Sequence, residues 1–350
     1  QQQQQQQKQQ PAVSAAPLEK LENPHFEAYY RRQAICPETE WPMFMAALRS
    51  ELPMAFRVNR GAHTAKPLLA QLRGSRVAVA AKEKEEDRAE YVPRELPWFP
   101  HGLGWQWNGL CAWSVKKDAR HRKLKAHLIW LADCGAITRQ EAVSMIPPLC
   151  LDIQPDHLVL DLCAAPGSKA SQLLEMLHWG DCQQGPRGAV VANEIVSKRA
   201  EVLAHTVGRL GSPCGIVTNI DAQFFPGLVG EDGQPLLFDR VLADVPCSGD
   251  GTLRKFPTLW SKWTPQDALG LHHRQYTILC RGLDLLRVGG RLVYSTCSLN
   301  PIEDEAVVAA ALRRYGGAVS LLPLPALEGL QGSPGLETWV VPHPDAEQHV

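Results

Sequence analysis

The sequence of 350 residues lacks several features that would define its class at once. No apolar run approaches the ~20 residues that a membrane-spanning helix needs. Near residue 1 there is no charged segment followed by an apolar one, which is the pattern of an export signal. The ten cysteines do not form a dense disulfide pattern, which favours free thiols in a reducing compartment. We therefore expect an intracellular, soluble protein without a membrane span.

Motifs for metals and for nucleotide phosphates are also missing. No cysteine pair has CxxC spacing and no histidine pair has HxxxH spacing, so the sequence predicts no metal site. Neither the GxGxxG fingerprint of dinucleotide-binding proteins nor the GxxxxGK[ST] phosphate loop is present, which argues against a nicotinamide dehydrogenase or an NTPase. The formal net charge is -1, so any surface for nucleic acid must be local.

Composition divides the chain into four parts. Residues 1–22 begin with nine glutamines and one lysine, and we expect them to be a disordered tail. Residues 23–150 mix helical patterns with a strand and are expected to form a smaller N-terminal α+β module. Residues 151–342 alternate strands with helices, and 343–350 are a polar tail. Because the first residue is not Met and the last ones are polar, we expect a truncated chain or an incomplete gene model.

The pattern after residue 151 predicts a doubly wound α/β sheet. Short β-rich runs alternate with helices whose apolar residues recur at i, i+3, i+4 and i+7. Such alternation implies a mostly parallel sheet with right-handed connections. We expect strands at 158–162, 189–192, 215–218, 240–243 and 291–295, helices around 265–286 and at 304–314, and closing strands at 319–322 and 338–341.

The N-terminal part has weaker patterns, and two of its features can be interpreted in two ways. We expect a strand at 56–59, a solvated loop over the mixed-charge run 82–90, and helices around 26–32, 43–49, 65–72 and 138–145, the last ended by two prolines. The tryptophans 98, 105, 107 and 113 are expected to pack between domains, or else to form a platform on which bases stack. The run Lys116 to Lys125 has six Lys or Arg and one Asp, and is either a solvated helix face or a patch that contacts phosphates.

Two cysteines lie just after predicted strands. Cys247 follows the run at 240–243, and Cys297 follows the run at 291–294. The carboxyl ends of parallel strands meet at one edge of an open α/β sheet, where such sheets bind ligands. We therefore expect both thiols in one crevice, where two thiols suggest covalent chemistry. Either cysteine alone would more simply be a buried structural thiol.

Other strand ends carry small residues and acids. The first strand leads into the turn Cys163 to Lys169, where small side chains allow a ligand to approach and a helix N-terminus offers free N–H groups. Glu194, Asp221 and Asp244 follow the next three strands, so we expect them to line the same crevice. This arrangement suits S-adenosylmethionine, which needs partners for ribose hydroxyls, an adenine amine and a charged amino-acid end. Any one of the acids alone is more simply a cap or a turn former.

Three segments carry a family resemblance. LDLCAAPGSK at 160–169, DVPCSGDGTLRK at 244–255 and YSTCSLNPIEDEAV at 294–307 resemble those of the Nop/Sun family of RNA cytosine-C5 methyltransferases. They are most similar to its eukaryotic tRNA-modifying branch, and RQEAVSMIPPL at 139–149 resembles that family's entry motif. The likeness extends over about residues 23–341. It implies a Rossmann-like enzyme that transfers the methyl group of S-adenosylmethionine to C5 of cytosine in RNA, most simply tRNA.

The resemblance also implies roles for individual residues. Cys297 would be the nucleophile, and Cys247 would assist product release. Residues 23–150 would engage the RNA, and the location would be the nucleus, with the cytoplasm as the alternative. Glu194 departs from the family, which usually has Asp there. The cofactor-binding residues would be Cys163, Ala164, Ala165, Pro166, Gly167, Ser168, Lys169, Glu194, Asp221 and Asp244.

Cytosine chemistry explains why thiols are needed. C5 is a poor nucleophile until C6 is attacked, and a thiolate can both add to C6 and leave again. A thiol with a pKa near ~8.5 is only slightly ionised at neutral pH, so Lys169 is a candidate either to lower that pKa or to contact the base. Asp244 is a candidate to stabilise charge near N3. The same chemistry on rRNA or mRNA, and an inactive RNA-binding fragment, remain as alternatives.

Overall fold

The structure is a computed structural model that describes residues 21–74, 92–180 and 185–342. The glutamine-rich tail up to residue 20, the mixed-charge run 82–90 and the polar tail 343–350 lie outside the described residues. Within them, no helix is both long and apolar enough to cross a bilayer, and no group of three His, Cys, Asp or Glu side chains is placed to hold a metal ion. The nine cysteines of the described residues are all free thiols.

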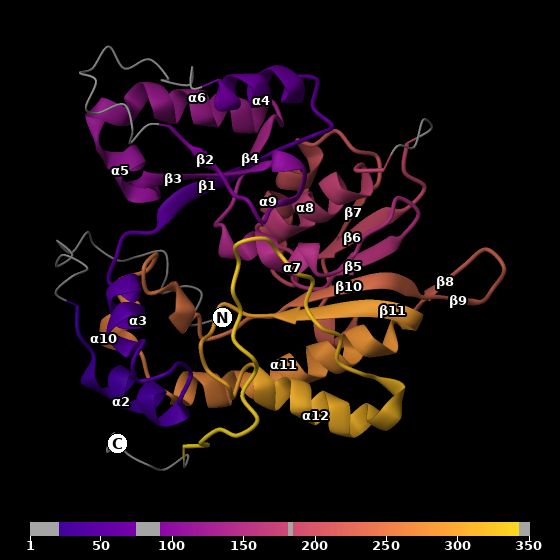
Figure 1. Cartoon of the computed structure of the whole chain (residues 1–350). Helices are drawn as coiled ribbons and strands as arrows, with labels where there is room; N and C mark the ends of the chain where they lie inside the picture. Colours follow the sequence, from indigo (N-terminus) through magenta and orange to yellow (C-terminus); the bar gives the residue numbers. More distant parts are fainter. Residues whose placement is uncertain (1–20, 75–91, 181–184, 343–350) are drawn as a thin grey trace.

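A five-stranded parallel sheet forms the centre of the larger part of the molecule (Figure 1). Its strand order is β11-β10-β5-β6-β7, and every neighbouring pair is parallel. This confirms the predicted doubly wound sheet. The strands are β5 (Leu158–Asp161), β6 (Ala189–Asn193), β7 (Gly215–Thr218), β10 (Phe238–Asp244) and β11 (Leu286–Ser295).

Helices cover both faces of this sheet. Figure 1 shows α8 (Ser168–Leu177) and α9 (Ser197–Gly208) on one face, with α11 (Gln266–Asp284) and α12 (Glu305–Tyr315) on the other. Successive strand residues point to opposite faces. Val159 of β5 accordingly packs in the core under α8, whereas its neighbour Leu160 packs in the core that contains Ile278 of α11.

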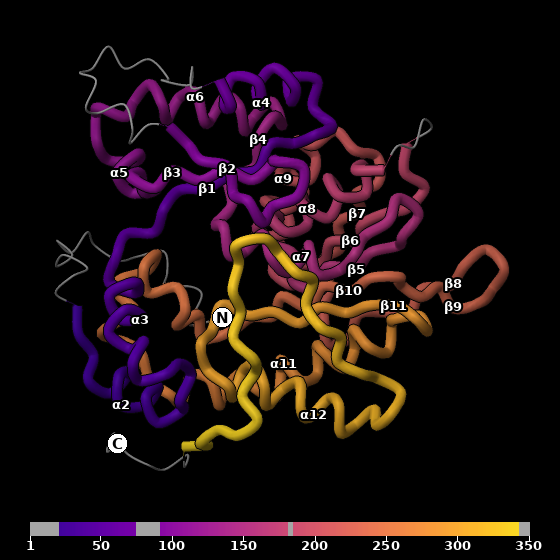
Figure 2. The backbone as a smooth tube through the Cα atoms, viewed as in Figure 1, coloured from indigo at the N-terminus to yellow at the C-terminus, as the bar shows by residue number. Residues whose placement is uncertain are grey.

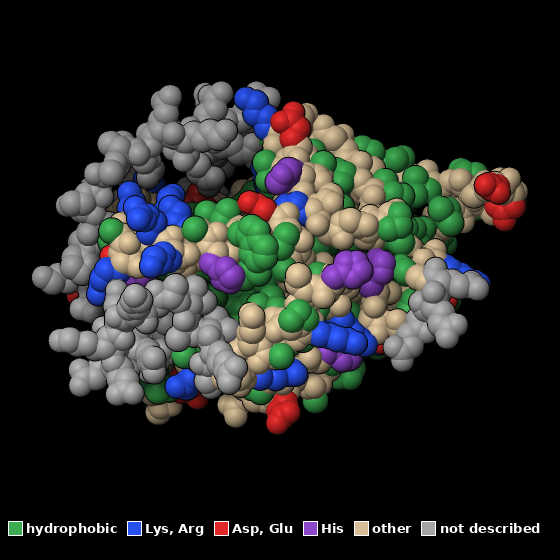
Figure 3. Space-filling view, turned by 90° about the horizontal axis from the view of Figure 1, so that it is seen from above, with side chains coloured by type: hydrophobic (Ala, Val, Ile, Leu, Met, Phe, Trp, Pro, Cys, Tyr) green, Lys and Arg blue, Asp and Glu red, His purple; other side chains and the backbone are tan. Residues whose placement is uncertain are grey.

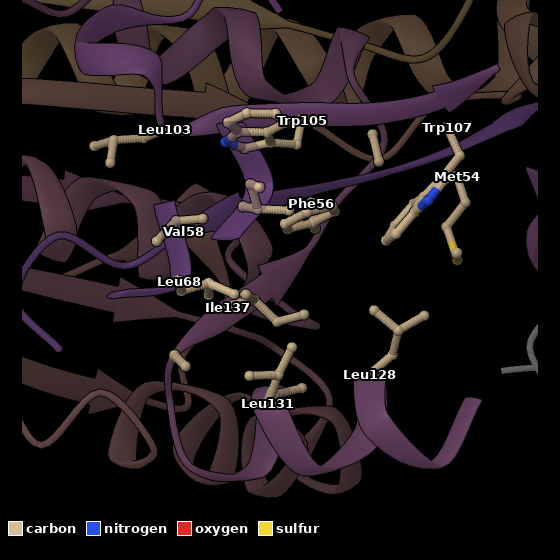
Figure 4. Packing of buried hydrophobic residues seen from close by; sticks show 14 of the residues in the cluster. Met54, Phe56, Val58, Leu68, Leu103, Trp105, Trp107, Leu128, Leu131 and Ile137 are labelled. Carbon is tan, nitrogen blue, oxygen red and sulfur yellow. The ribbon is translucent and has the colours of Figure 1, made fainter. Parts of the chain in front are cut away.

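A second sheet belongs to the N-terminal part of the chain. It is antiparallel, has the order β2-β3-β1-β4, and is covered by helices α4, α5 and α6. Figure 4 shows its core, in which side chains of β1 and β3 meet Leu128 and Leu131 of α6. Its elements are β1 (Pro53–Val58), α4 (Ala65–Arg73), β2 (Arg94–Glu95), β3 (Gly104–Cys111), α5 (Ala112–Lys117), α6 (Arg122–Asp133) and β4 (Ile137–Arg139).

The tryptophans do not sit between the two sheets as predicted. Trp105 and Trp107 lie on β3 and are buried in the core of the N-terminal sheet (Figure 4), so neither offers a face to a base. Trp98 is half-buried against the same core, and Trp113 on α5 is 67% exposed. Instead, the ring of Trp179, which follows α8, contacts the rings of Phe99 and His101 in the N-terminal part.

Helices α2 (Pro24–Gln33) and α3 (Trp41–Leu48) pack against the part of the chain that follows β10 rather than against the N-terminal sheet. Figure 2 shows α2 and α3 beside α10 (Leu259–Lys262), although more than 200 residues separate them in the sequence. Phe26 and Tyr30 share a buried aromatic cluster with Trp260 and Trp263. The range 23–150 therefore contributes to two packing units.

A buried ion pair joins the N-terminal sheet to α8. Arg57 of β1 donates two hydrogen bonds to the carboxylate of Glu175, at 3.0 and 2.9 Å, and Thr138 of β4 adds a third at 3.1 Å. Arg57 is fully buried, so the pair depends on this bidentate geometry to offset its desolvation. Because α8 begins at the predicted cofactor turn, the pair links the N-terminal sheet to the helix that carries this turn.

The predicted helix at 138–145 is wrong. Ile137–Arg139 forms β4, which pairs with β1, and burial of Ile137 in the N-terminal core outweighs the weak helical pattern. Helical structure is confined to a 3-10 turn at Val143–Met145 and to α7 (Ile146–Leu149). The two prolines lie in the first turn of α7, where the missing N–H groups have no intrahelical partner, so they begin a helix rather than end one.

The predicted closing strands at 319–322 and 338–341 are also wrong. Residues 319–342 contain no strand, and β11 lies at the edge of the sheet. Short apolar runs form strands only where an edge pairs with them, and here Leu321 and Leu322 are exposed. The segment instead forms a strap (the yellow segment after α12 in Figure 2) whose Val340 exchanges two backbone hydrogen bonds with the side chain of Gln33.

A short hairpin interrupts the connection between β7 and β10. Its strands are β8 (Leu228–Val229) and β9 (Pro235–Leu236), which pair antiparallel and project from the sheet (Figure 1). The hairpin precedes the amino end of β10, whereas Cys247 follows its carboxyl end, so the hairpin does not contribute to the site described below.

Candidate active site

The two predicted strand-end cysteines meet. Cys247 Sγ and Cys297 Sγ are 3.2 Å apart, and the backbone N–H of Cys297 donates to Cys247 Sγ at 3.3 Å. The parallel register of β10 and β11 places Asp244 opposite Ser295, so the two loops leave the sheet at the same level. Gly251 donates its N–H to the carbonyl of Cys297 at 3.0 Å, and a Cβ at that position would lie only 2.8 Å from this oxygen. Cys297 is exposed and Cys247 is half-buried.

The surroundings shift the pKa values of the two thiols in opposite directions. The pKa of Cys297 is lowered, first because the S–H of Cys247 donates to it and also because Lys169 is near, while burial and Asp244 oppose the shift. The pKa of Cys247 is raised by the same hydrogen bond, which favours its protonated form, and by burial. Two such close thiols titrate as a pair. Of the two thiols, Cys297 is therefore the one that loses its proton first.

A salt bridge lies beside the thiols. Lys169 Nζ donates to Asp244 Oδ2 at 2.7 Å, and Ser295 Oγ donates to the other oxygen, Oδ1, at 2.8 Å. Both charged side chains remain partly accessible. Lys169 comes from the first turn of α8 and Asp244 from the end of β10, so the pair joins the predicted cofactor turn to the cysteine loop. A cation and a carboxylate are therefore available to a ligand in this crevice.

The turn Cys163 to Lys169 leads from β5 into α8. Gly167 is the N-cap of α8 with φ 107°, a left-handed conformation that favours glycine. A Cβ there would lie 3.0 Å from side-chain atoms of Leu203 and Thr206, so α9 packs close against the turn. Ala164 and Ala165 are buried, whereas Pro166 is exposed. The turn thus brings backbone N–H groups of a helix start to the crevice with little side chain in the way.

Asp161 is a site residue that the sequence reading passed over as part of a strand. It is almost fully buried, and its Oδ2 has no hydrogen-bond partner among the described residues. Burial and the nearby charge of Asp244 raise the pKa of Asp161 to about 8, while Lys169 opposes the shift. A buried acceptor without a donor, next to a turn that exposes N–H groups, fits a polar ligand such as the ribose or amino-acid end of S-adenosylmethionine.

The other two predicted cofactor acids have local partners. Glu194 is buried, accepts the N–H of Val196 at 2.9 Å, and lies 3.4 Å from a guanidinium nitrogen of Arg199. Its charge acts on Asp161, so it belongs to the same group of strand-end residues. Asp221 caps a short 3-10 turn by accepting the N–H of Gln223 at 3.0 Å. Its observed contacts are those of a turn former, and its cofactor role stays a prediction.

Two buried carboxylates beneath the thiols were missed by the sequence reading. Glu303 accepts hydrogen bonds from Ser248 and Ser298, which follow the two cysteines. Asp250 accepts from Tyr30 of α2 and from the backbone N–H of Leu299. An acid just before a helix, such as Glu303, is commonly explained by its favourable charge at the helix N-terminus. The sequence around Glu303 therefore did not indicate a role in the site. The contact with Tyr30 spans 220 residues and leaves no local pattern in the sequence.

The basic cluster lies on α5 and α6, two helices that pack on the N-terminal sheet. Lys116 and Lys117 end α5, and Arg122 and Lys123 begin α6; all four side chains are exposed. Figure 3 shows Lys and Arg side chains gathered at this end of the molecule. Exposure is compatible both with a solvated helix face and with a phosphate-binding patch, so the phosphate role stays a prediction.

Residues 148–349 match the model of a protein family described as 16S rRNA methyltransferase RsmB/F. The chain is 43% identical over 348 residues to a Drosophila melanogaster protein named tRNA (cytosine(34)-C(5))-methyltransferase, with 95% of this chain and 46% of that protein covered. It is 44% identical over 326 residues to the multisite-specific tRNA:(cytosine-C(5))-methyltransferase of Saccharomyces cerevisiae, with 91% and 47% covered. The chain thus spans about half the length of the curated relatives it matches.

A solved structure supports the fold. A methyltransferase homolog protein from Pyrococcus horikoshii aligns with a TM-score of 0.58 and 27% sequence identity. The alignment covers 81% of this chain and 77% of that chain, so it includes more than the parallel sheet. The fold is therefore the Rossmann-like fold of S-adenosylmethionine-dependent methyltransferases, together with an N-terminal portion.

The unequal thiols generate a testable prediction. Substituting Cys247→Ala removes the S–H that donates to the Cys297 thiolate, so we expect the pKa of Cys297 to rise. The measurement is the rate of iodoacetamide alkylation at Cys297 as a function of pH, followed by peptide mass spectrometry. The midpoint of that profile should move to higher pH in C247A and stay in place in C134A, which removes an exposed thiol elsewhere. An unchanged or lower midpoint in C247A would contradict the assignment.

Proposed function

Because the chain belongs to the RsmB/F methyltransferase family, we propose that it transfers the methyl group of S-adenosylmethionine to C5 of cytosine in RNA, with tRNA as the substrate. The observation that carries this proposal is the pair of thiols 3.2 Å apart at adjacent strand ends, beside Lys169 and Asp244. A transfer to oxygen or nitrogen needs no thiol pair, whereas C5 of cytosine must first be activated by addition at C6. The two tRNA-methylating relatives support tRNA rather than another RNA.

Cys297 is the nucleophile in this proposal. Its thiolate adds to C6, and the electron pair of the C5–C6 double bond moves to C5, where it is shared with C4 and N3 and makes C5 nucleophilic. The lowered pKa and the exposure of Cys297 support this role over Cys247, which holds its proton and is less accessible. Asp244 and Lys169, which pair with each other beside the thiols, are proposed to contact the ring edge, where charge accumulates as the thiolate adds.

Cys247 acts after the methyl transfer. C5 then carries both the methyl group and its original hydrogen, so a base must remove that proton before the C5–C6 double bond re-forms and Cys297 leaves. Cys247 is the nearest titratable neighbour of Cys297. It is proposed to accept the C5 proton as a thiolate, after its own proton has passed to solvent. Without it, the covalent protein–RNA adduct would persist.

The cofactor site is proposed at the turn Cys163 to Lys169, with Asp161, Glu194, Asp221 and Asp244 around it. When bound there, S-adenosylmethionine supplies an electrophilic methyl group. The chain contributes the N–H groups at the start of α8 and the unpaired Oδ2 of Asp161 as binding partners. Glu194 is proposed to serve the ribose in place of the family's usual Asp, its longer side chain being compatible with a hydroxyl contact.

RNA has to present an unstacked cytosine, because a thiol cannot reach C6 inside a stacked helix. The basic cluster at Lys116, Lys117, Arg122 and Lys123 is proposed to hold the RNA backbone.

Ribosomal RNA is the second candidate substrate, since the matching family model is described by 16S rRNA methylation. A nuclear location belongs to the proposal and rests on the family resemblance alone.

The first test combines product and adduct analysis. Wild type, C297A and C247A would be incubated with S-adenosylmethionine and a tRNA pool, with C134A as a matched thiol control. We expect C297A to lose methylation by at least about 1,000-fold and to form no denaturant-resistant adduct. C247A should accumulate such an adduct, and C134A should behave as wild type. Methylation by C297A, or an adduct trapped by C297A instead, would reverse the assignment.

The basic cluster has its own test. Neutralising Lys116, Lys117, Arg122 and Lys123 to Gln should weaken RNA binding and flatten the slope of log K against log salt concentration by about 0.7–0.9 for each phosphate that the variant no longer neutralises. Binding would be measured by fluorescence anisotropy at several salt concentrations. A matched quadruple variant would neutralise exposed cations of four other helices, namely Lys66, Lys198, Arg274 and Arg313. An equal slope for the cluster variant and wild type would rule out the phosphate role.

A further inference from the structure

One fully buried carboxylate connects the two cysteine loops from below. Glu303 has no exposed surface, and it lies at the end of the loop that carries Cys297, from where its side chain reaches the loop that carries Cys247. Its Oε1 accepts the backbone N–H of Ser248 at 2.8 Å, and its Oε2 accepts the hydroxyl groups of Ser248 and Ser298, both at 2.5 Å. Ser248 and Ser298 are the residues that directly follow the two cysteines, so Glu303 joins the two loops at equivalent positions.

Glu303 is itself held in place from two further directions. Gln275 of α11 donates from its side-chain amide to Glu303 Oε1 and to the carbonyl of Pro246, both at 3.0 Å. Tyr294 of β11 donates its hydroxyl to the backbone carbonyl of Glu303. Four donors therefore converge on the carboxylate, which matches the number of acceptor sites that such a group offers. A side chain with this many partners has one position only.

The carboxylate of Asp250 extends the same network. Its Oδ1 accepts the N–H of Leu299 at 2.7 Å and lies 3.0 Å from Ser298 Oγ. Its Oδ2 accepts from Trp263 at 3.1 Å and from Tyr30. Ser298 thus lies between two buried acids and has one hydroxyl hydrogen to share between them. Asp250 and Glu303 therefore both hold Ser298, the residue that follows Cys297, and so fix the position of this loop.

A buried acid at this position has both a cost and a benefit for stability. Burying a carboxylate carries a large desolvation cost, and an apolar side chain of similar volume is often neutral or stabilising in its place. An apolar residue would, however, leave the N–H of Ser248 and two hydroxyl groups without an acceptor. What Glu303 provides is the fixed separation of two loops, and that separation sets the contact between the thiols. Its negative charge also helps to keep the proton on Cys247, because it raises the pKa of that thiol.

We propose that Glu303 is a positioning residue for the methyl transfer, which holds the two cysteine loops in register so that Cys297 and Cys247 act on the same cytosine. Glu303 touches neither thiol, and it acts through Ser248 and Ser298. This inference rests on the proposed function for its catalytic consequence. Its geometric consequence, the contact between the two sulfur atoms, does not require RNA and can be tested separately.

The catalytic test compares E303A, E303Q and wild type on tRNA. A displacement of ~1 Å in a reacting group can cost about 100-fold in rate, so we expect kcat of E303A to fall by at least that factor while KM for S-adenosylmethionine stays unchanged. E303Q should lie between E303A and wild type, because its carbonyl still accepts from Ser248 and Gln275 and the serine hydroxyls can rotate to accept from its amide. If E303A does not fold, the test is the comparison of kcat between E303Q and wild type.

The geometric test uses diamide and no RNA. Diamide takes two electrons and two protons from Cys247 and Cys297, it is reduced to the hydrazine, and a disulfide forms between the two sulfur atoms. We expect wild type to form this disulfide rapidly and E303A at least about 10-fold more slowly, because the loops are no longer joined. The linked peptides would be quantified by mass spectrometry, with thermal unfolding recorded to confirm folded protein.

Glu305 provides the matched control. It lies two residues further along, at the start of α12, and its carboxylate accepts the N–H of Leu336 of the strap rather than a group of the cysteine loops. E305A should keep both the wild-type kcat and the wild-type rate of disulfide formation. Folded E303A with wild-type disulfide formation, or equal losses in E303A and E305A, would overturn the positioning role. A wild type that forms the disulfide but methylates no RNA would refute the proposed function and leave the geometric result intact.

Discussion

The parallel pairing of β10 with β11 is the constraint on which the site depends. Their register places Asp244 opposite Ser295, and the two cysteines follow three and two residues later. Parallel strands that end at the same level deliver their following loops to one edge of the sheet. The thiols meet because of this register. A slip by one residue would turn every side chain of one strand to the other face, together with the loop that follows it.

Other residues of the site hold the two cysteine loops in this arrangement. Close approach of the loops requires the absence of a side chain at Gly251, and the buried acids beneath them supply acceptors for N–H and hydroxyl groups that would otherwise be unsatisfied. The α2 helix reaches this network through Tyr30, and β1 reaches α8 through the pair of Arg57 and Glu175. The N-terminal residues thus support the site from two sides, which explains why the fold extends beyond the parallel sheet.

Much of the fold and part of the site could be predicted from the sequence. Strand and helix periodicity are local properties, so β5, β6 and β7 were placed within a residue of their observed bounds, and the position of Cys247 and Cys297 after apolar runs predicted that they would meet. The failures concern pairing between distant segments. Residues 319–322 were predicted as a strand but pair with no strand in the structure, whereas Thr138 was predicted in a helix but pairs with Arg57 of β1 as part of β4. The role of Glu303 could not be predicted, because its hydrogen-bond partners lie on three segments that are separate in the sequence.

The central claim is that Cys297 forms the bond to C6 and that Cys247 serves the release step. The most direct measurement uses tRNA transcribed with 5-fluorocytidine, in which fluorine replaces the hydrogen that has to leave C5 after methyl transfer. The protein would be incubated with this RNA and S-adenosylmethionine, digested with protease and nuclease, and examined by mass spectrometry. The account predicts a methylated fluorocytidine nucleotide on the peptide that contains Cys297. The same nucleotide on the peptide that contains Cys247 would contradict it.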